Sequence, residues 1–175
     1  TDSITADRTA GTIPASGSVS FYLRMFNAKH GQTLPKNFTM DVSAISGSWE
    51  EGTGLDMEAY KDKDESNWIN RVASSSAGTH AWATQGGDYY TDTSSSFSAS
   101  FDSGVEDIEV DITTLVEQWA NSAGNVLGSK NDEGVGVFLS SVYSGESRSY
   151  YTKKFFGRGT EFFFKKPYIE ARWDS

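Results

Sequence analysis

The chain of 175 residues contains no cysteine, only two histidines and only three prolines. The absence of cysteine excludes disulfide bonds, thiolate metal sites and a cysteine nucleophile. Cations are also scarce, because 15 lysines and arginines stand against 24 acidic residues and give a net charge of −9. This charge argues against general binding to DNA or RNA, which requires clustered cations over a whole face of a protein.

Membrane segments and common catalytic motifs are missing as well. No apolar run approaches the length of a membrane span, so we expect no membrane partner. Residues 1–5 lack the cationic and apolar regions of a signal peptide, and we interpret the sequence as a mature or excised part of a longer chain. There is no G-x-S-x-G elbow, no phosphate-binding loop and no H-E-x-x-H motif. His30 and His80 are isolated in the sequence, so we predict that the protein is not an enzyme.

Alternation of apolar and polar residues dominates the sequence and predicts an all-β fold, because strands with one buried face have a period of two. The length suits a single domain, residues 1–175, with its own core. Strands are expected at residues 19–26, 38–42, 108–112, 135–139 and 169–173. Strands with one apolar and one polar face favour two sheets packed through their apolar faces. The predicted fold class is a two-sheet, jelly-roll-like β-sandwich with one short helix.

The predicted helix covers residues 112–119, where apolar residues recur at helical spacing. Thr114 followed by Glu117 fits a capping box at its start, and Trp119 shares the apolar stripe. Residues 73–78 and 91–103 are serine-rich and weakly hydrophobic, so we expect exposed loops there.

A long aromatic and acidic insertion is expected at about residues 46–104, between the second and third predicted strands. It contains Trp49, Trp68 and Trp82. Exposed rings on loops stack on sugars or anchor protein interfaces, whereas buried rings form a small core beneath a long loop. The two interpretations stand side by side: Trp49, Trp68 and Trp82 are predicted contacts for a partner or a glycan, and the packed alternative is favoured for Trp68.

Residues 153–166 combine five cations with five phenylalanines around Gly157 and Gly159. This pattern predicts a hairpin with phenylalanine-rich arms and a cationic tip. Lys153, Lys154 and Arg158 are the predicted contacts for a partner or a glycan. The alternative is that the phenylalanines belong to the core and the lysines to a solvated rim.

An internal partner for these cations exists in the same chain. Between residues 41 and 111 there are 15 acidic residues and three cations. Opposite charges attract, so the acidic and basic regions are expected to pair within one fold or between copies of the chain, head to tail.

One acidic stretch is the best candidate for a metal site. Clustered carboxylates on a loop suit calcium, which binds oxygen ligands. The candidate ligands are Asp56, Glu58, Asp62 and Asp64. The alternative is a solvated acidic loop, because Lys61 and Lys63 interleave the carboxylates. No other cofactor is expected.

Four short motifs follow one another along the chain. They are Trp49-Glu50, then Asp111-Ile112-Thr113-Thr114-Leu115-Val116-Glu117-Gln118-Trp119, then Gly134-Val135-Gly136-Val137, and then Lys166-Pro167-Tyr168-Ile169-Glu170-Ala171. In this order they resemble the DNRLRE family of β-sandwich modules. The resemblance implies a jelly-roll-like sandwich of secreted, cell-surface and carbohydrate-associated proteins, some of which bind acidic polysaccharide.

A second resemblance is to structural proteins of tailed bacteriophages. Residues 49–56, 67–69 and 151–156 are similar to sequences common among them. We therefore predict a non-enzymatic structural or adhesive module of an extracellular assembly, with a bacteriophage virion as the preferred assembly and other copies of the chain or other virion proteins as partners. The alternative is a carbohydrate-binding module of a secreted protein that recognises an acidic polysaccharide. A polysaccharide lyase or hydrolase is the third hypothesis. The expected location is the virion or the extracellular space.

Overall fold

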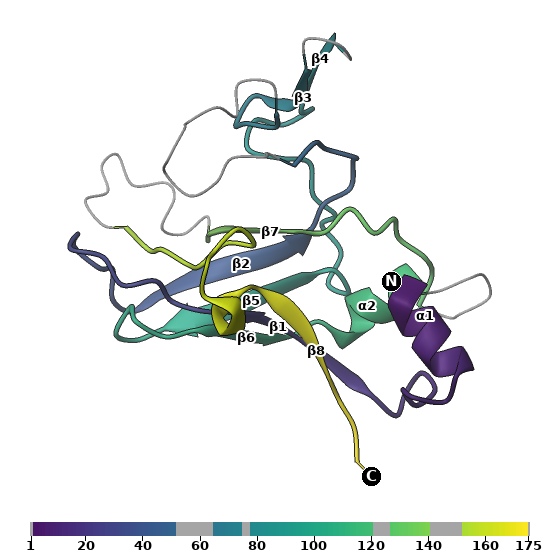
Figure 1. Cartoon of the computed structure of the whole chain (residues 1–175). Helices are drawn as coiled ribbons and strands as arrows, with labels where there is room; N and C mark the ends of the chain where they lie inside the picture. Colours follow the sequence, from purple (N-terminus) through teal and green to yellow (C-terminus); the bar gives the residue numbers. More distant parts are fainter. Residues whose placement is uncertain (1, 52–64, 75–77, 121–126, 141–151, 175) are drawn as a thin grey trace.

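The computed structural model describes residues 2–51, 65–74, 78–120, 127–140 and 152–174 (Figure 1). In chain order its elements are α1 (Asp2–Thr9), β1 (Ser20–Met25), β2 (Phe38–Ala44), β3 (Asn70–Ser74), β4 (Gly78–Ala81), β5 (Ser96–Phe101), β6 (Ile108–Asp111), α2 (Thr113–Ala120), β7 (Val135–Leu139), the 3₁₀ helix η1 (Phe163–Lys165) and β8 (Tyr168–Arg172). The metal candidates Asp56, Glu58, Asp62 and Asp64 lie outside the described residues.

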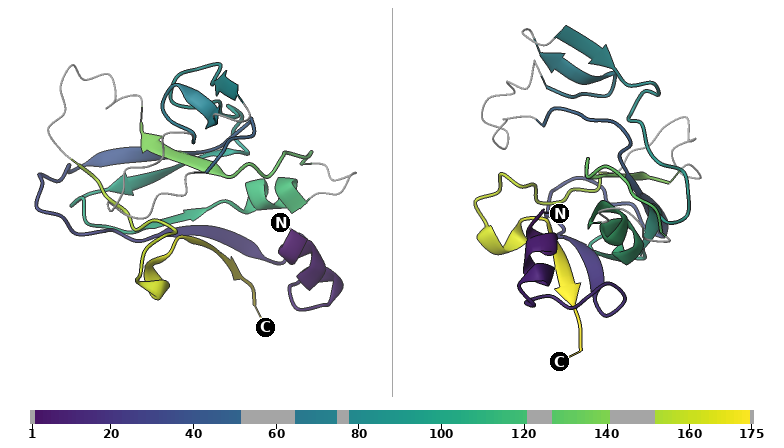
Figure 2. Two further views of the ribbon diagram at one scale, coloured as in Figure 1. Left: turned by 45° about the horizontal axis from the view of Figure 1, so that its top comes forward. Right: turned by 90° about the vertical axis from the view of Figure 1, so that its right-hand side faces the viewer.

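The strands form two three-stranded antiparallel sheets and a separate two-stranded hairpin. β1 is the central strand of one sheet, with β6 and β8 at its edges. β2 is the central strand of the other, with β5 and β7 at its edges. The sheets lie one above the other, with α1 and α2 at one end (Figures 1 and 2). Of the predicted all-β, jelly-roll-like sandwich with one short helix, the structure confirms a mostly β architecture with two three-stranded sheets, and it adds the helix α1, which was not predicted.

A single hydrophobic core joins the two sheets. Successive residues of a strand point to opposite faces, so the alternating apolar residues of both sheets meet between them. The buried members are Val19, Phe21, Leu23, Phe38, Val42, Ala44, Phe101, Ile108, Val110, Ile112, Leu115 and Val116, each no more than 7% exposed. The strands predicted around 19–26, 38–42 and 108–112 therefore supply the core as expected.

α2 closes one end of the core, and its start differs from the predicted capping box. The Asp111 carboxylate accepts a hydrogen bond from the backbone N–H of Thr113 at 2.9 Å. Thr113 Oγ1 in turn accepts from the backbone N–H of Phe21 in β1 at 2.8 Å. The hydroxyl of Thr114 points elsewhere and donates to the Ser94 carbonyl. The capping-box prediction is wrong because both of its side chains make long-range contacts.

The second of those side chains, Glu117, binds the N-terminal helix α1, which the sequence did not predict. Glu117 is 4% exposed, and Arg8 of α1 donates two hydrogen bonds to its carboxylate, at 2.9 and 2.5 Å. The Arg8 guanidinium also lies 5.8 Å from the centre of the Phe21 ring. This ion pair holds α1 against α2 across a large sequence separation. No helix in the described ranges is both long and apolar enough to span a bilayer.

The predicted insertion contains two structures that its composition concealed. β5 falls in the serine-rich stretch and pairs with β2 along its length, so the expectation of an exposed loop at 91–103 is wrong for residues 96–101. Phe101 from β5 is buried, and its ring stacks on Phe38 at 4.6 Å. β3 and β4 pair as a short hairpin that projects away from the two sheets (Figures 1 and 2).

Candidate docking surfaces

The first arm of the phenylalanine-rich segment joins the end of β1, not the second arm. Phe156 donates its backbone N–H to the Phe26 carbonyl at 3.0 Å, and Ala28 donates to the Lys154 carbonyl at 2.9 Å. Between them, Asn27 and Phe155 form an antiparallel bridge. Within residues 152–174 no ladder joins the two arms. The predicted hairpin is therefore wrong, because the chain after Met25 offers the first arm a pairing partner.

The pairing of the first arm with residues 26–28 places the Lys153 side chain in a partly buried position. Its ammonium donates hydrogen bonds to Asn27 Oδ1 at 2.8 Å, the Gly104 carbonyl at 3.0 Å and the Glu106 carbonyl at 2.7 Å. It also lies 4.8 Å and 4.7 Å from the ring centres of Phe101 and Phe155. Burial lowers the pKa of Lys153 from its usual value. These contacts occupy the ammonium within the chain, although we had predicted it to meet a partner.

The second arm, in contrast, lies on the surface of the protein. A turn closed by a hydrogen bond from the Thr160 N–H to the Gly157 carbonyl leads into η1. Phe162, Phe163 and Phe164 are 55%, 74% and 86% exposed. Three consecutive large apolar side chains with this exposure are unusual on a protein that has a complete core elsewhere.

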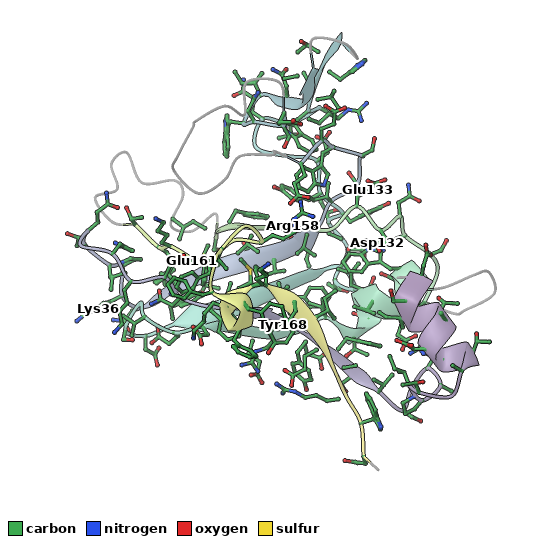
Figure 3. The ribbon with its side chains drawn as sticks, in the orientation of Figure 1. Lys36, Asp132, Glu133, Arg158, Glu161 and Tyr168 are labelled. Atoms are coloured by element: carbon green, nitrogen blue, oxygen red, sulfur yellow. The ribbon has the colours of Figure 1, made fainter. Side chains whose placement is uncertain are left out.

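Cations and further aromatic rings surround these phenylalanines. The Lys166 ammonium lies 6.0 Å from the Phe163 ring centre, and the Lys165 ammonium lies 4.7 Å from that of Phe26. Tyr168 of β8 is 45% exposed and packs near Phe26, with 5.9 Å between ring centres (Figure 3). We call the set Phe162, Phe163, Phe164, Lys165, Lys166 and Tyr168 the phenylalanine surface.

The remaining predicted cations lie before η1. Lys154 is exposed. Arg158 forms an ion pair with Glu51 at 2.9 Å, and both side chains are at least half exposed (Figure 3). The basic segment and the acidic insertion thus meet within one chain at this point. A pair so exposed to water contributes little to stability.

Two of the three insertion tryptophans are anchored by their indole N–H groups. Trp49 donates to the Glu133 carbonyl at 2.7 Å, and Trp82 donates to the Asn67 carbonyl at 2.9 Å. Trp49 is 36% exposed and Trp82 is half-buried. These hydrogen bonds fix the orientation of both indoles, and both predicted roles, packing beneath the loop and contact with a partner, stay predictions for Trp49 and Trp82.

Trp68 behaves differently and is 70% exposed, beside Ile69 at 54%. The expectation that Trp68 is packed is wrong. One edge of its indole lies so close to Gly86 that a Cβ at that position would stand 2.7 Å from the ring. The Asn67 side chain fixes the turn by accepting from the backbone N–H groups of Ile69 and Asn70. We call Trp68 and Ile69 together the tryptophan tip.

No described cluster has the chemistry of a metal site. Among the described residues there is no group of three or more histidine, aspartate or glutamate side chains that could hold an ion.

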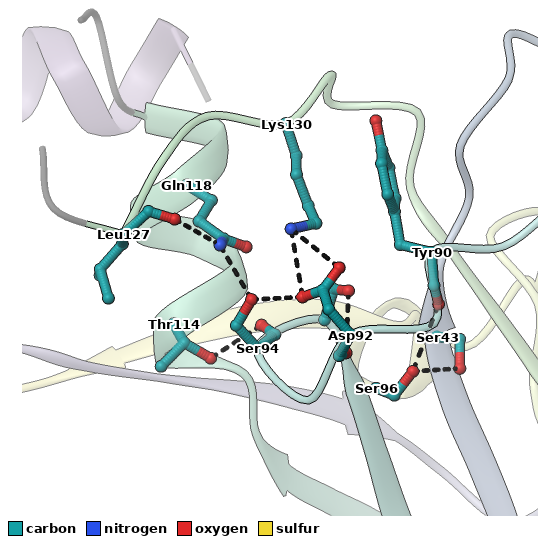
Figure 4. Close-up of polar contacts among 10 residues, drawn as sticks. Ser43, Tyr90, Asp92, Ser94, Ser96, Thr114, Gln118, Leu127 and Lys130 are labelled. Carbon is teal, nitrogen blue, oxygen red and sulfur yellow. Dashed lines mark hydrogen bonds and ion pairs between the residues drawn. The ribbon is translucent and has the colours of Figure 1, made fainter. Parts of the chain in front are cut away.

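A polar network joins the loop before β5 to α2 (Figure 4). Asp92 forms an ion pair with Lys130 at 3.2 Å and accepts a hydrogen bond from the Ser94 hydroxyl. The Ser94 hydroxyl and the Leu127 carbonyl accept hydrogen bonds from the Gln118 amide. The Ser94 hydrogen bond, followed by Lys130, lowers the pKa of Asp92 to about 2. These contacts connect the loop before β5 to α2 and to the segment that contains Leu127 and Lys130.

An open pocket of about 400 Å³ lies at the end of β1 and β8. Tyr22, Arg172 and Trp173 contribute to its lining, together with residues 17–20. The Arg172 guanidinium lies 4.2 Å from the Tyr22 ring centre and is paired with Glu109 and Glu170, which raise the pKa of Arg172. The sequence prediction missed this pocket because its residues come from both ends of the chain.

No family model, curated protein or solved structure matches this chain. The similarity to DNRLRE modules and to phage structural proteins therefore stays a prediction from short motifs. Any functional conclusion depends on the surfaces described above.

Proposed function

We propose that this chain is a non-enzymatic structural or adhesive module of an extracellular assembly, with a bacteriophage virion as the preferred assembly. Capsid decorations, fibres and tail components are the candidate roles. In this proposal the two sheets belong to a jelly-roll-like sandwich, and the motif resemblance supports that assignment. The module acts by presenting surfaces to other proteins.

The observation that carries the proposal is the exposure of Phe162, Phe163 and Phe164. With the exposures given above, the three rings present on the order of 400 Å² of apolar surface to water. Patches of this size on a folded protein commonly mark interaction sites. Because the core between the sheets is complete without these rings, they are free to be buried by a partner.

The polar clusters support a non-enzymatic role. Burial lowers the pKa of Lys153, and the hydrogen bond from Ser94 together with the ion pair to Lys130 lowers the pKa of Asp92 to about 2. Perturbed pKa values often mark catalytic groups, but structural ion pairs and buried hydrogen bonds produce the same shifts.

The proposal is tested by locating and counting the protein in its native source. Quantitative mass spectrometry of purified particles should find many copies of the chain per particle. The double variant Phe163→Ser/Phe164→Ser should remain folded but be lost from particles. Val105→Ser is the matched control, because Val105 is a comparably exposed apolar residue at 53%. Recovery of the chain outside particles, attached to a catalytic domain, would contradict the proposal.

Carbohydrate binding is the second candidate, supported by the pocket beside β1 and β8. Trp173 lines it and is 44% exposed, and an exposed indole can stack on a sugar ring. This site differs from the predicted one, whose cation Lys153 is occupied within the chain. Glycan-array binding that is lost in Trp173→Ala and kept in Val105→Ser would support the candidate. Equal binding by both variants would contradict it.

A further inference from the structure

Two separate apolar surfaces of this chain lie in surroundings of opposite charge. The tryptophan tip belongs to a region whose described part, residues 46–51, 65–74 and 78–90, holds four carboxylates and one arginine. They are Glu50, Glu51, Glu65, Asp88 and Arg71. The phenylalanine surface contains Lys165 and Lys166, and the exposed Lys154 and the single carboxylate of residues 153–166, Glu161, precede it in the sequence, so cations predominate there. Apolar centres with complementary charged rims are the pattern of partner surfaces in protein interfaces.

The tryptophan tip is held in a defined conformation before any partner arrives. Gly86 donates its backbone N–H to the Trp68 carbonyl at 2.8 Å, and its φ of +95° favours glycine. Asp88 fixes the same loop by accepting from the backbone N–H groups of Ala83 and Thr84, at 2.9 and 2.8 Å. An ordered indole loses little conformational entropy on binding, which is a property of interface hot spots.

The two surfaces do not bury one another within a single chain. The ion pair between Arg158 and Glu51 joins their regions, yet Trp68 stays 70% exposed and Phe164 stays 86% exposed. The β3–β4 hairpin beside the tip projects away from the sheets, whereas η1 lies against them (Figures 1 and 2). Each surface is therefore available to a second molecule.

We infer that the tryptophan tip of one copy docks on the phenylalanine surface of the next copy, head to tail. This inference rests on the proposed structural role and names the partner as a second copy of this chain. Contact between two different surfaces is heterologous, so it produces a ring when the rotation closes and an open filament when it does not. Rings of Trp68 and Phe163 form the buried centre, and carboxylates face Lys165 and Lys166 at the rim.

The experiment mixes two complementary variants. Trp68→Ser/Ile69→Ser lacks the tip but keeps the phenylalanine surface, and Phe163→Ser/Phe164→Ser has the opposite defect. Analytical ultracentrifugation should show concentration-dependent oligomers for the native chain and monomers for each variant alone. A mixture of the two should form dimers only, because one intact tip meets one intact surface and neither end can grow.

The expected loss for each variant alone is about 30-fold or more in the dissociation constant, as for other aromatic hot spots. Charge reversal by Lys165→Glu/Lys166→Glu should weaken association and reverse its salt dependence, because salt screens the rim attraction in the native chain and the rim repulsion in the variant. This variant tests the contact with the apolar side chains intact. Val105→Ser should associate like the native chain.

Three results would overturn the inference. They are a native chain that stays monomeric at its solubility limit, a tip variant that still associates through its phenylalanine surface, and a mixture that contains no dimer although both variants are folded by circular dichroism. The proposed function fails separately. A monomeric chain found in many copies per particle contradicts only the head-to-tail contact, whereas a self-associating chain absent from particles contradicts the structural role.

Discussion

The two halves of the phenylalanine-rich segment both combine phenylalanines with lysines, yet they lie in opposite environments. In the first half, Phe155 packs against Phe101 at 6.3 Å between ring centres, and Lys153 is enclosed by carbonyls and rings. In the second half, Phe163 and Phe164 contact each other at 5.4 Å between ring centres, Lys166 lies beside Phe163, and both rings are largely exposed to water. The difference shows that residue type did not decide burial here. What decided it was whether an unpaired backbone segment, 26–28, lay within reach.

The tryptophans repeat this contrast and provide the largest expected difference in stability. Trp119 packs against the core from α2, whereas Trp68 is exposed. Trp119→Ala should lower the free energy of unfolding by about 3 kcal/mol through cavity formation. Trp68→Ala should change it by less than about 0.5 kcal/mol. Urea unfolding of both variants measures the difference, and equal losses would remove the distinction between the two sites.

The phenylalanine pair gives the next largest effect. Phe155→Ala should cost about 2 kcal/mol, less than for a fully buried ring because Phe155 is only half-buried. Phe163→Ala should cost less than about 0.5 kcal/mol. Thermal unfolding monitored by circular dichroism compares them. A Phe163 variant as unstable as the Phe155 variant would mean that the second arm also belongs to the core.

Lys153 and Lys154 are adjacent in the sequence but differ in burial, so their variants test the same comparison at a smaller scale. Lys153→Met removes the donor to the Gly104 and Glu106 carbonyls and should cost about 1 to 2 kcal/mol. Lys154→Met should be neutral within about 0.5 kcal/mol, since Lys154 is exposed. Chemical denaturation with matched baselines checks both. If Lys153→Met were neutral, the enclosure of its ammonium would contribute nothing to the fold.

The smallest effect depends on pH. The pKa of Asp92 is about 2 in the folded chain, below its value of 3.8 in the absence of partners. Its contribution is therefore complete above about pH 4 and is lost as the pH falls towards 2. Because Asp92 is 47% exposed, that contribution is about 1 kcal/mol or less. Asp92→Asn should lose it at pH 6 and match the native chain near pH 2. A constant difference from pH 6 to pH 2 would exclude the ionised form of the Asp92 carboxyl as its source.

Local periodicity predicted β1 and β6 well, because Phe21, Leu23, Ile108 and Val110 alternate with polar neighbours and are all buried. The same signal was present in β5, where Phe97, Ala99 and Phe101 alternate with serines, but the low hydrophobicity of the stretch concealed it. Exposure of the second phenylalanine arm was also foreseeable in part. Three consecutive phenylalanines cannot share one face of a strand.

The remaining features depended on partners distant in the sequence. α1 has a weak apolar pattern, and its Arg8 contacts Glu117 across 109 positions. Trp68 and Trp82 share a short stretch of the insertion, yet only Trp82 donates its indole N–H to a nearby carbonyl. Such outcomes depend on which backbone groups and charges come together after folding, and single-sequence patterns do not contain that information.

The sequence by itself determined the β architecture, the apolar faces of the central strands and the segregation of acidic and basic residues. These properties follow from composition and from a period of two, which act within a few residues. Tertiary structure alone decided that Lys153 is enclosed while Lys154 is exposed, and that Trp68 remains exposed while Trp82 is half-buried. A side chain is buried only when another part of the folded chain lies close enough to exclude water from it. Which side chains are covered is therefore decided when the two sheets and the insertion pack together.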